Sequence, residues 1–338
     1  MRGMTIARVA AEAGVGVGTV SRVLNGSPSV SEDTRKRVLE AIATLDYQPS
    51  AVARALSTGR THAVGVVAPF FTRPSVIERL RGVSRTLAGA EYQLILFDVE
   101  HAAQRREAFR SLAVRGRIDG ILSVSLSPTE REAARLESTG VPVVLLDRDH
   151  PTLPALTIDD REGGRMAARY LIGLGHRRLA FLGDEEGNEF GFDSSAHRRE
   201  GFEQAVAAAG LTLPPEWSLR RPHSHDAARE GAAALLAGAD RPTAIFATSD
   251  VQAIGVLEAA QAAGIAVPGE LSVMGFDDVE AAGYLGLTTI AQPLEESGAL
   301  GAELLLRALA GEPVERRRLP LAIVERATTG TPGLADRE

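Results

Sequence analysis

Several residues able to bind a ligand through charge or aromatic contact follow predicted buried strands in the larger, C-terminal part of the chain. Asp159 and Asp277 each end an apolar run, and Arg198 lies near the start of a predicted helix. Carboxylates and a guanidinium bind the paired hydroxyls of a sugar well. Phe70 and Phe71 follow the first apolar run and offer rings that can stack on the apolar face of a sugar. The pattern predicts a small-molecule site.

Simpler structural explanations stay open for some of these side chains. An aspartate at the end of a strand often caps the next helix, as Asp159 could, and adjacent phenylalanines such as Phe70 and Phe71 are more often core residues. The sequence has no G-x-S-x-G motif and no coherent set of nucleophile, base and orienting group, so we expect neither an enzyme nor a cofactor. His223 and His225 could chelate a metal, but no further ligands of suitable spacing accompany them, so no metal site is expected.

The elements that must position these residues alternate between short apolar runs and helical patterns from residue 61 onward. We expect strands at 63–68, 92–99, 118–124, 142–147, 155–158, 179–183, 244–248, 271–276 and 289–291. Most are continuous apolar runs, which are typical of parallel strands covered on both faces. Helical patterns lie between them, for example at 76–87, 163–174, 198–209 and 251–263. The series predicts βαβ units, and its length exceeds one doubly wound sheet, so we expect two lobes.

Charge separates the first sixty residues from the rest of the chain. The 338 residues carry a formal net charge of −7 and include no cysteine. Residues 1–60 nevertheless contain eight basic and five acidic side chains, as expected when one small unit contacts a phosphate backbone. No run approaches the roughly 20 apolar residues that span a bilayer. With no leader pattern in residues 1–8, we expect a cytoplasmic protein and no membrane partner.

Three short helices are expected in this basic unit. Thr5 can cap the first helix, and Gly14 suits the left-handed turn that ends it. A second helix over 17–25 places small and polar residues with Arg22 on one face, where a guanidinium can bond both O6 and N7 of guanine. Ser31 can cap a third helix. This spacing predicts a helix-turn-helix, although the helical pattern alone would equally suit a small bundle without a ligand.

The same unit contains a dense set of sequence motifs. They are Thr5-Ile6, Val9-Ala10, Ala13-Gly14-Val15, Thr19-Val20-Ser21-Arg22-Val23-Leu24-Asn25, Val30-Ser31, Thr34-Arg35, Tyr47 and Pro49. In these positions the chain resembles the headpiece of the lactose-repressor (LacI/GalR) family of transcription regulators. Gly16 departs from the serine usual there, and Gly18 from the alanine often found. Each glycine should destabilise the start of the recognition helix by up to about 1 kcal/mol relative to alanine.

The resemblance implies DNA contacts at the matched positions. Val17, Gly18 and Arg22 correspond to positions that contact base edges, and because Gly18 has no side chain, we expect most direct readout from Arg22. Phosphate contacts are implied for Thr5, Thr19, Ser21, Asn25 and Thr34. Residues 49–60 resemble the family's hinge helix, in which Leu56 matches the leucine that wedges into the minor groove and kinks the DNA.

Further motifs continue through the body. They are Gly163-Gly164, Leu174 to Arg178, Val267-Pro268, Gly275 to Asp278 and Gln292-Pro293. Their resemblance to the same family implies an α/β, two-lobed periplasmic-binding-protein-like body with two doubly wound parallel sheets. The implied domains are 1–48 (helix-turn-helix headpiece), 49–60 (hinge), 61–160 with 291–321 (N-terminal lobe) and 161–290 with 322–338 (C-terminal lobe). Effector contacts between the lobes are implied for Phe70, Phe71, Asp159, Arg198, Ser249, Asp277 and Gln292.

These implications define an expected function. We expect a sequence-specific DNA-binding repressor of a carbohydrate-utilisation operon whose operator affinity changes when a mono- or oligosaccharide binds between the lobes. Two headpieces related by a two-fold axis predict a homodimer on a near-palindromic operator. The family resemblance implies that helix 76–87 and a segment near 280 form the interface. The rival hypothesis is a solute-binding transport receptor with the same two-lobed body. Binding to an operator duplex would separate the two.

Overall fold

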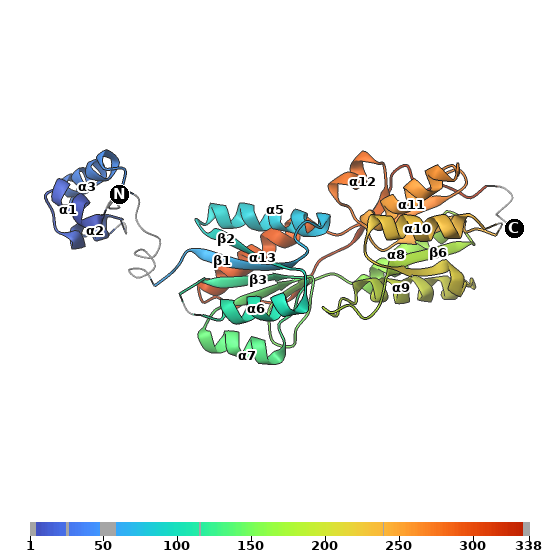
Figure 1. The fold of residues 1–338 in the computed structure, drawn as a ribbon, viewed down its shortest axis with the longest axis horizontal. Helices are drawn as coiled ribbons and strands as arrows, with labels where there is room; N and C mark the ends of the chain where they lie inside the picture. The colour runs from blue at the N-terminus through green and yellow to red at the C-terminus, as the bar shows by residue number, and fades with distance from the viewer. Residues whose placement is uncertain (1–4, 25–26, 48–58, 115, 239, 334–338) are drawn as a thin grey trace. The chain divides into compact units, whose positions relative to one another are not determined.

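Two compact units make up the chain, residues 1–62 and residues 63–338. The computed structural model describes residues 5–24, 27–47, 59–114, 116–238 and 240–333 (Figure 1). The predicted phosphate contact Asn25 and the predicted wedge Leu56 lie outside the described residues, as does most of the predicted hinge helix. Among the described residues, no helix combines the length and apolar character needed to cross a membrane.

The first unit contains the three expected helices, α1 (Ile6–Glu12), α2 (Val17–Leu24) and α3 (Glu32–Thr44). Ser31 caps α3 as predicted, because its side chain accepts a hydrogen bond from the Thr34 amide at 3.4 Å. Thr5 occupies the N-cap position of α1, but the predicted side-chain cap is wrong, since its hydroxyl makes no capping bond. Gly14 has the expected left-handed backbone, with φ of 63°. The helices enclose a small core centred on Val9, Val20 and Val38.

The second unit contains two six-stranded sheets. The first has the order β11-β5-β4-β3-β1-β2, comprising β1 (Ala63–Pro69), β2 (Gln93–Val99), β3 (Gly120–Val124), β4 (Val143–Leu146), β5 (Ala155–Thr157) and β11 (Arg317–Arg318). The second has the order β12-β10-β9-β8-β6-β7, comprising β6 (Leu179–Asp184), β7 (Ser218–Arg221), β8 (Ala244–Ala247), β9 (Ser272–Asp277), β10 (Thr288–Ala291) and β12 (Ala322–Val324). All pairings are parallel except that of β10 with β12. The expected two-lobed, doubly wound architecture is therefore confirmed.

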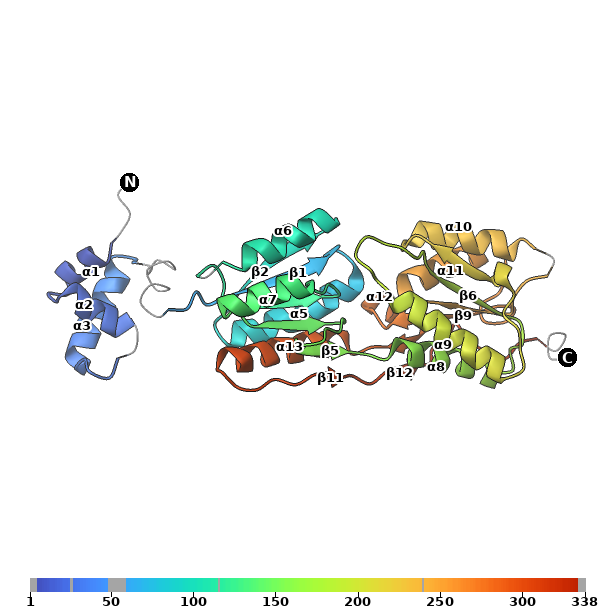
Figure 2. The same ribbon diagram turned by 90° about the horizontal axis from the view of Figure 1, so that it is seen from below.

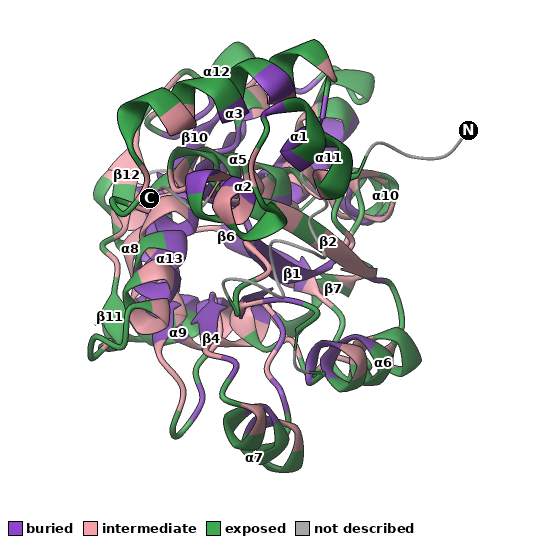
Figure 3. Cartoon of the chain, turned by 90° about the vertical axis from the view of Figure 1, so that its left-hand side faces the viewer, coloured by how far each residue is buried: buried purple, intermediate pink, exposed green. Residues whose placement is uncertain are grey.

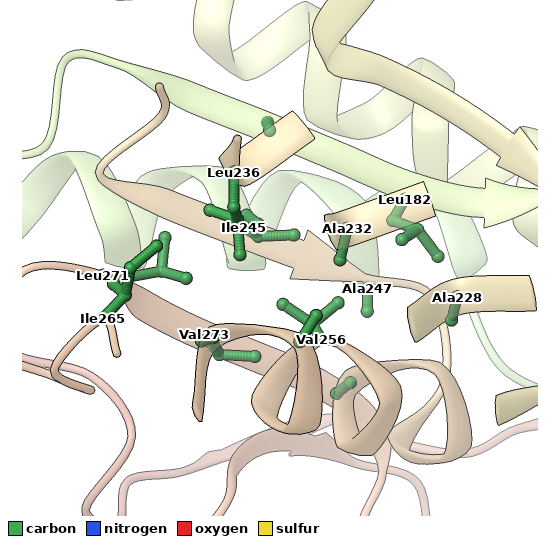
Figure 4. Close-up of a cluster of buried hydrophobic side chains, with 14 of the residues drawn as sticks. Leu182, Ala228, Ala232, Leu236, Ile245, Ala247, Val256, Ile265, Leu271 and Val273 are labelled. Carbon is green, nitrogen blue, oxygen red and sulfur yellow. The ribbon is translucent and has the colours of Figure 1, made fainter. Parts of the chain in front are cut away.

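Helices cover both faces of each sheet (Figures 1 and 2). In the N-terminal lobe, α5 (Pro74–Gly89) and α13 (Leu294–Leu309) pack on one face, and α6 (Ala102–Leu112) and α7 (Glu130–Thr139) on the other. In the C-terminal lobe, α8 (Asp160–Gly173) and α9 (Ser194–Ala208) pack on one face, and α10 (His225–Leu236), α11 (Asp250–Ala262) and α12 (Glu280–Tyr284) on the other. Surface helices such as α7 bury one side only (Figure 3). Figure 4 shows the core between the second sheet and α10 and α11, which includes Leu182, Ile245 and Val256.

Two helix pairs pack through glycines placed opposite one another. In the pair α8 and α9, a Cβ on Gly164 or Gly201 would collide with a backbone carbonyl of the facing helix. The same holds in the pair α5 and α13 for Gly82 and Gly298. Only glycine permits this separation, so each pair is in direct backbone contact.

The chain passes between the two lobes three times. The crossings fall at residues 158–159, between β5 and α8, at residues 292–293, between β10 and α13, and at residues 319–321, between β11 and β12. Each crossing is only two or three residues long. The ends of the strands beside them border the space between the lobes.

Candidate functional site

Strand ends from both lobes converge on one cavity. Its lining includes residues at or just after the carboxyl ends of β1, β3 and β4 in the first sheet and of β6, β8 and β9 in the second. Three lining residues have a left-handed backbone, with φ of 51° at Ser125, 63° at Asp147 and 117° at Asp277. Positive φ is uncommon outside glycine, and such residues cluster at ligand sites. This backbone turns polar side chains toward the gap between the lobes.

The cavity has a volume of about 100 Å³ and a polar, charged lining. The structure brings four of the predicted effector residues together in it, namely Arg198, Ser249, Asp277 and Gln292. All four are at least nine-tenths buried. The opposite wall comes from the N-terminal lobe and includes Arg79, Ser125 and Asp147.

Arg198 is the most heavily engaged side chain of the cavity. Its Nε donates to Asp160 Oδ1 at 2.8 Å, and its Nη1 donates to the carbonyl oxygen of Thr248 at 2.6 Å. The guanidinium carbon lies 3.5 Å from the ring centroid of Phe276, in cation–π contact. Burial on its own would lower the pKa of Arg198, but the charges of Asp160 and Asp277 and of Asp147 raise it. Arg198 is therefore a fixed cation whose Nη2 has no protein partner within the described residues.

Burial dominates the ionisation of two neighbouring carboxyls. It raises the pKa of Asp277, although Arg198, the hydrogen bond from Gln292 and Arg79 oppose the shift. Behind it, burial and the charge of Asp277 raise the pKa of Asp250 to about 8. Asp250 accepts hydrogen bonds from the Thr289 hydroxyl at 2.6 Å and from the Val279 amide at 2.9 Å. Protonation of Asp250 relieves the repulsion between two buried carboxylates.

A chain of polar contacts joins the two lobes across the cavity. Gln292 Nε2 donates to Asp277 Oδ1 at 2.5 Å, and Gln292 Oε1 accepts from Arg79 Nη2 at 2.8 Å. The same nitrogen of Arg79 lies 3.2 Å from Asp147 Oδ1. Ser125 in turn donates to Asp147 Oδ2 at 2.8 Å. Gln292, which lies at a crossing between the lobes, thus contacts Asp277 of the C-terminal lobe directly and is linked through Arg79 to Asp147 of the N-terminal lobe.

A second polar cluster belongs to the C-terminal lobe. His223 Nδ1 lies 2.9 Å from Asp184 Oδ1, which also accepts from Gln252 Nε2 at 3.0 Å. Burial on its own would raise the pKa of Asp184, but the hydrogen bond and charge of His223, with Arg198 and Arg73, hold it below its usual range. Ser249 caps α11 and donates to Gln252 Oε1 at 3.1 Å. His225 has other partners, Asp226 and Glu258, so the two histidines do not converge. The described residues contain no group of three or more potential metal ligands.

Three predicted effector residues do not line this cavity. Asp159 caps α8 by accepting from the Glu162 amide and pairs with Arg318 at 3.1 Å, whereas the next residue, Asp160, lines the cavity. Phe71 is 40% exposed outside it. Phe70 lines an adjoining cavity. The structure thus places the carboxylate of Asp160 in the cavity, whereas that of Asp159 caps the helix.

Sequence reasoning missed several lining residues, chiefly Arg79, Asp147, Asp184 and His223. Asp147 ends the expected strand 142–147, and Asp184 directly follows the expected strand 179–183, so the rule applied to Asp159 and Asp277 would also have found them. Arg79 gave no such signal. It lies on an amphipathic helix, and its burial depends on Gln292 and α13, more than 200 residues later.

The first unit presents a polar and largely exposed face on α2. Val17, Gly18 and Arg22 are exposed, whereas Val20 and Val23 on the opposite side are buried. Thr19, Ser21 and Thr34 are half-buried, and Thr5 is exposed. The predicted DNA contacts that the structure describes are thus available at the surface of this unit.

A helix-turn-helix unit followed by a two-lobed body with a charged interlobe cavity defines a class, the ligand-responsive DNA-binding regulators. Residues 5–50 match the family described as bacterial regulatory proteins, lacI family, and residues 168–329 match the periplasmic binding protein-like domain. Catabolite control protein A of Priestia megaterium is 32% identical over 332 residues, covering 96% of this chain and 99% of that protein. The chain belongs to the LacI family and is a DNA-binding transcription regulator with an effector-binding body.

Other relatives and solved structures agree. The transcriptional repressor PurR of Photobacterium profundum is 33% identical, with coverage of 93% of this chain and 94% of that protein. The lac repressor dimer bound to operator and the anti-inducer ONPF superposes with a TM-score of 0.85 at 25% identity, covering 97% and 100% of the two chains. The complex of the regulator CelR with cellobiose is 31% identical, with a TM-score of 0.69 and coverage of 96% and 100%.

Proposed function

We propose that this regulator is a repressor of carbohydrate-utilisation genes whose operator affinity is switched by a neutral sugar held between the lobes. The arrangement of Arg198 with Asp160 and Asp277 carries the proposal. It offers a cationic donor beside buried carboxylate acceptors, which suits the paired hydroxyls of a sugar. The names of two relatives point the same way, because solved LacI-family regulators have cellobiose or ribose bound.

Charge balance supports a neutral ligand. Three of the arginines that line the cavity already have a carboxylate partner, since Arg79 pairs with Asp147, Arg148 with Asp193 and Arg198 with Asp160. An anionic ligand that bound at Arg79 or Arg198 would displace Asp147 or Asp160 and leave a largely buried carboxylate uncompensated. A polyol instead adds hydrogen bonds without adding charge.

The DNA-binding part of the proposal rests on the first unit. Arg22 would contact guanine, Val17 would make an apolar contact, and Gly18 would allow close approach of the helix to the base edges. The phosphates would be held by Thr5, Thr19, Ser21, Asn25 and Thr34, and Leu56 would wedge into the minor groove. The domain boundaries we propose are those given by resemblance, with the headpiece at 1–48 and the hinge at 49–60.

A homodimer in the cytoplasm completes the proposal. Ile77 on α5 is 44% exposed, and Tyr284 and Leu285 at the end of α12 are 79% and 50% exposed. The helices that carry these apolar side chains lie close together, because Arg81 Nη2 on α5 is 3.5 Å from Glu280 Oε2 on α12. A two-fold interface over α5 and α12 would cover these residues and bring two headpieces to one operator.

Operator binding tests the proposal directly. The full-length protein is used to select binding sites from a randomised duplex pool, and affinity for the selected duplex is measured by fluorescence anisotropy at physiological salt. We expect a near-palindromic site and an affinity that changes when the matching sugar is added. The transport-receptor hypothesis predicts no selection of any duplex, and that outcome would overturn the proposal. Light scattering that shows a monomer bound to the operator would overturn its dimer component.

A further inference from the structure

A second cavity, of about 360 Å³, lies beside the one described above. We call the first the inner cavity and the second the outer cavity. Both are lined by Arg73, Asp184, Phe192 and His223, so they meet at these residues. Sites for small molecules usually measure about 300–1,000 Å³. The inner cavity falls below this range and the outer cavity within it, so the pair offers room for more than one ring.

Aromatic side chains line the outer cavity. Phe70 and Phe190 meet edge to face with ring centroids 5.7 Å apart, and Phe190 lies 5.3 Å from Phe192. All three are half-buried, so part of each side chain stays accessible. The apolar face of a pyranose ring packs well on such a surface.

The loop that carries two of these rings is held in place from both lobes. Asn188 donates to the Phe192 carbonyl oxygen at 2.9 Å and accepts from the Phe192 amide at 2.9 Å. Glu189 reaches the other lobe and accepts from the Ala102 amide at the start of α6 at 2.8 Å. Hydrogen bonds from both lobes therefore define the position of the loop that lines the outer cavity.

Arg73 stands between the two cavities with its hydrogen-bonding capacity unused. Of the four arginines that line the inner cavity, it is the one whose guanidinium has no hydrogen bond or ion pair to the residues that the structure describes. Its guanidinium carbon lies 4.2 Å from the ring centroid of Phe70, which fixes its position. Five donors are thus available to a ligand that extends from one cavity to the other.

Charge around the outer cavity disfavours an anion. Its lining includes four carboxylates, Asp184, Glu185, Glu186 and Glu189, against Arg73 and His223. Arg199 and Arg220 pair with Glu186, so an anionic sugar would be repelled chiefly by Asp184, Glu185 and Glu189, whereas a neutral sugar meets aromatic rings and a free donor.

We infer that the outer cavity is a second saccharide subsite and that the effector is a neutral sugar of at least two rings. One ring occupies the inner cavity beside Arg198, and the next packs on Phe70, Phe190 and Phe192. Arg73 donates to oxygens at the junction of the two rings and so determines selectivity for chain length. This inference rests on the proposed function, because it takes the inner cavity to hold a sugar.

The test compares matched sugars of one and two rings on the full-length protein. The probes are glucose, galactose, mannose and xylose, with cellobiose, maltose, lactose, mannobiose and xylobiose, screened by thermal shift and measured by isothermal titration calorimetry. We expect at least one disaccharide to bind at least tenfold more tightly than its own monosaccharide. Arg73→Ala should weaken the disaccharide by roughly ten- to a hundredfold and the monosaccharide by less, because Arg73 also lines the inner cavity; equal losses would overturn its role in selectivity. Arg131→Ala, an exposed arginine on α7, is the control and should match the wild type.

Each other outcome rejects a definite part of the reasoning. A monosaccharide that binds as tightly as every disaccharide would overturn the second subsite and leave the proposed sugar response standing. Binding of a disaccharide that Arg73→Ala does not weaken would overturn the role of Arg73. If none of the probes binds, both the subsite and the sugar response fail. The melting temperature without sugar checks folding, and Arg73→Ala should preserve it because the Arg73 side chain makes no cap bond to α5.

Discussion

Removal of Arg198 should destabilise the C-terminal lobe as well as weaken ligand binding. In Arg198→Ala, Asp160 loses the guanidinium that donates to it at 2.8 Å. Asp277 loses the nearby positive charge that stabilises its ionised form against burial. Breaking a buried ion pair from one side typically costs about 3–5 kcal/mol, because the remaining charge stays buried without compensation. We expect a loss of this size in the free energy of unfolding near pH 7.5.

The pH dependence of this loss follows from the two carboxyls. Their pKa values are already raised in the folded protein, and without Arg198, which lowers both, they should rise further. A carboxyl with a raised pKa in the folded state binds more protons folded than unfolded. Its contribution to the free energy of unfolding is full below its pKa in the unfolded chain, near 4. That contribution is lost as the pH rises through its pKa in the folded protein. The loss in free energy of unfolding of Arg198→Ala relative to the wild type should therefore be small near pH 5 and increase toward pH 8.

Urea unfolding followed by tryptophan fluorescence is a suitable assay. Trp217 is the only tryptophan and is buried against the core of the C-terminal lobe, so it reports on the affected part. Arg161→Ala is the control, because Arg161 pairs with Glu200 at 2.6 Å while both side chains are 45% exposed. Such a pair contributes about 0–1 kcal/mol. A loss in Arg198→Ala no larger than in the control, or a loss that is constant from pH 5 to pH 8, would refute the reasoning.

Three further predictions test the helix packing, the buried carboxyl pair and the DNA wedge. Gly164→Ala should lower the free energy of unfolding, measured in urea, by about 1–3 kcal/mol, because the new Cβ meets the backbone of α9. This loss is expected despite the better helix propensity of alanine, and unchanged stability would contradict it. Asp250, with a pKa of about 8, makes the free energy of unfolding fall between about pH 4 and pH 8. Asp250→Asn should remove up to about 1.4 kcal/mol per pH unit of that slope. Wild type and variant with the same dependence of stability on pH would argue against it. Leu56→Ala should weaken binding to operator far more than to random DNA in fluorescence anisotropy, and equal losses would speak against a wedge.

The apolar strands were predictable because burial on both faces leaves a clear signature in the sequence. Each of the nine expected regions contains a strand. The three missed strands, β7, β11 and β12, have no such signature. β7 and β11 contain four of the chain's arginines between them, at Arg220, Arg221, Arg317 and Arg318, and lie at sheet edges where polar side chains are tolerated. β12 has only three residues, which is too short for alternation to be recognised.

The site was predictable where a side chain depends on its own strand and not where it depends on distant packing. Asp277 lies at the end of a strand, so its position follows from local pattern. The choice between Asp159 and Asp160 depends on which carboxylate caps α8, and both residues suit that role in sequence. Arg73 looks like an ordinary charged residue near a helix start. Its relation to the outer cavity exists only because the loop 185–193 of the other lobe closes over it.

The paired glycines of α8 with α9 and of α5 with α13 determine where the body can deform. The backbones of these helices are in direct contact, so no layer of side chains between them can be compressed. We expect each lobe to move as a rigid unit. We therefore expect a ligand that binds at the strand ends to change the angle between the lobes by bending the three short crossings at 158–159, 292–293 and 319–321. A small rotation about these crossings displaces each atom in proportion to its distance from them. The largest displacement is therefore expected at the ends of the lobes farthest from the ligand.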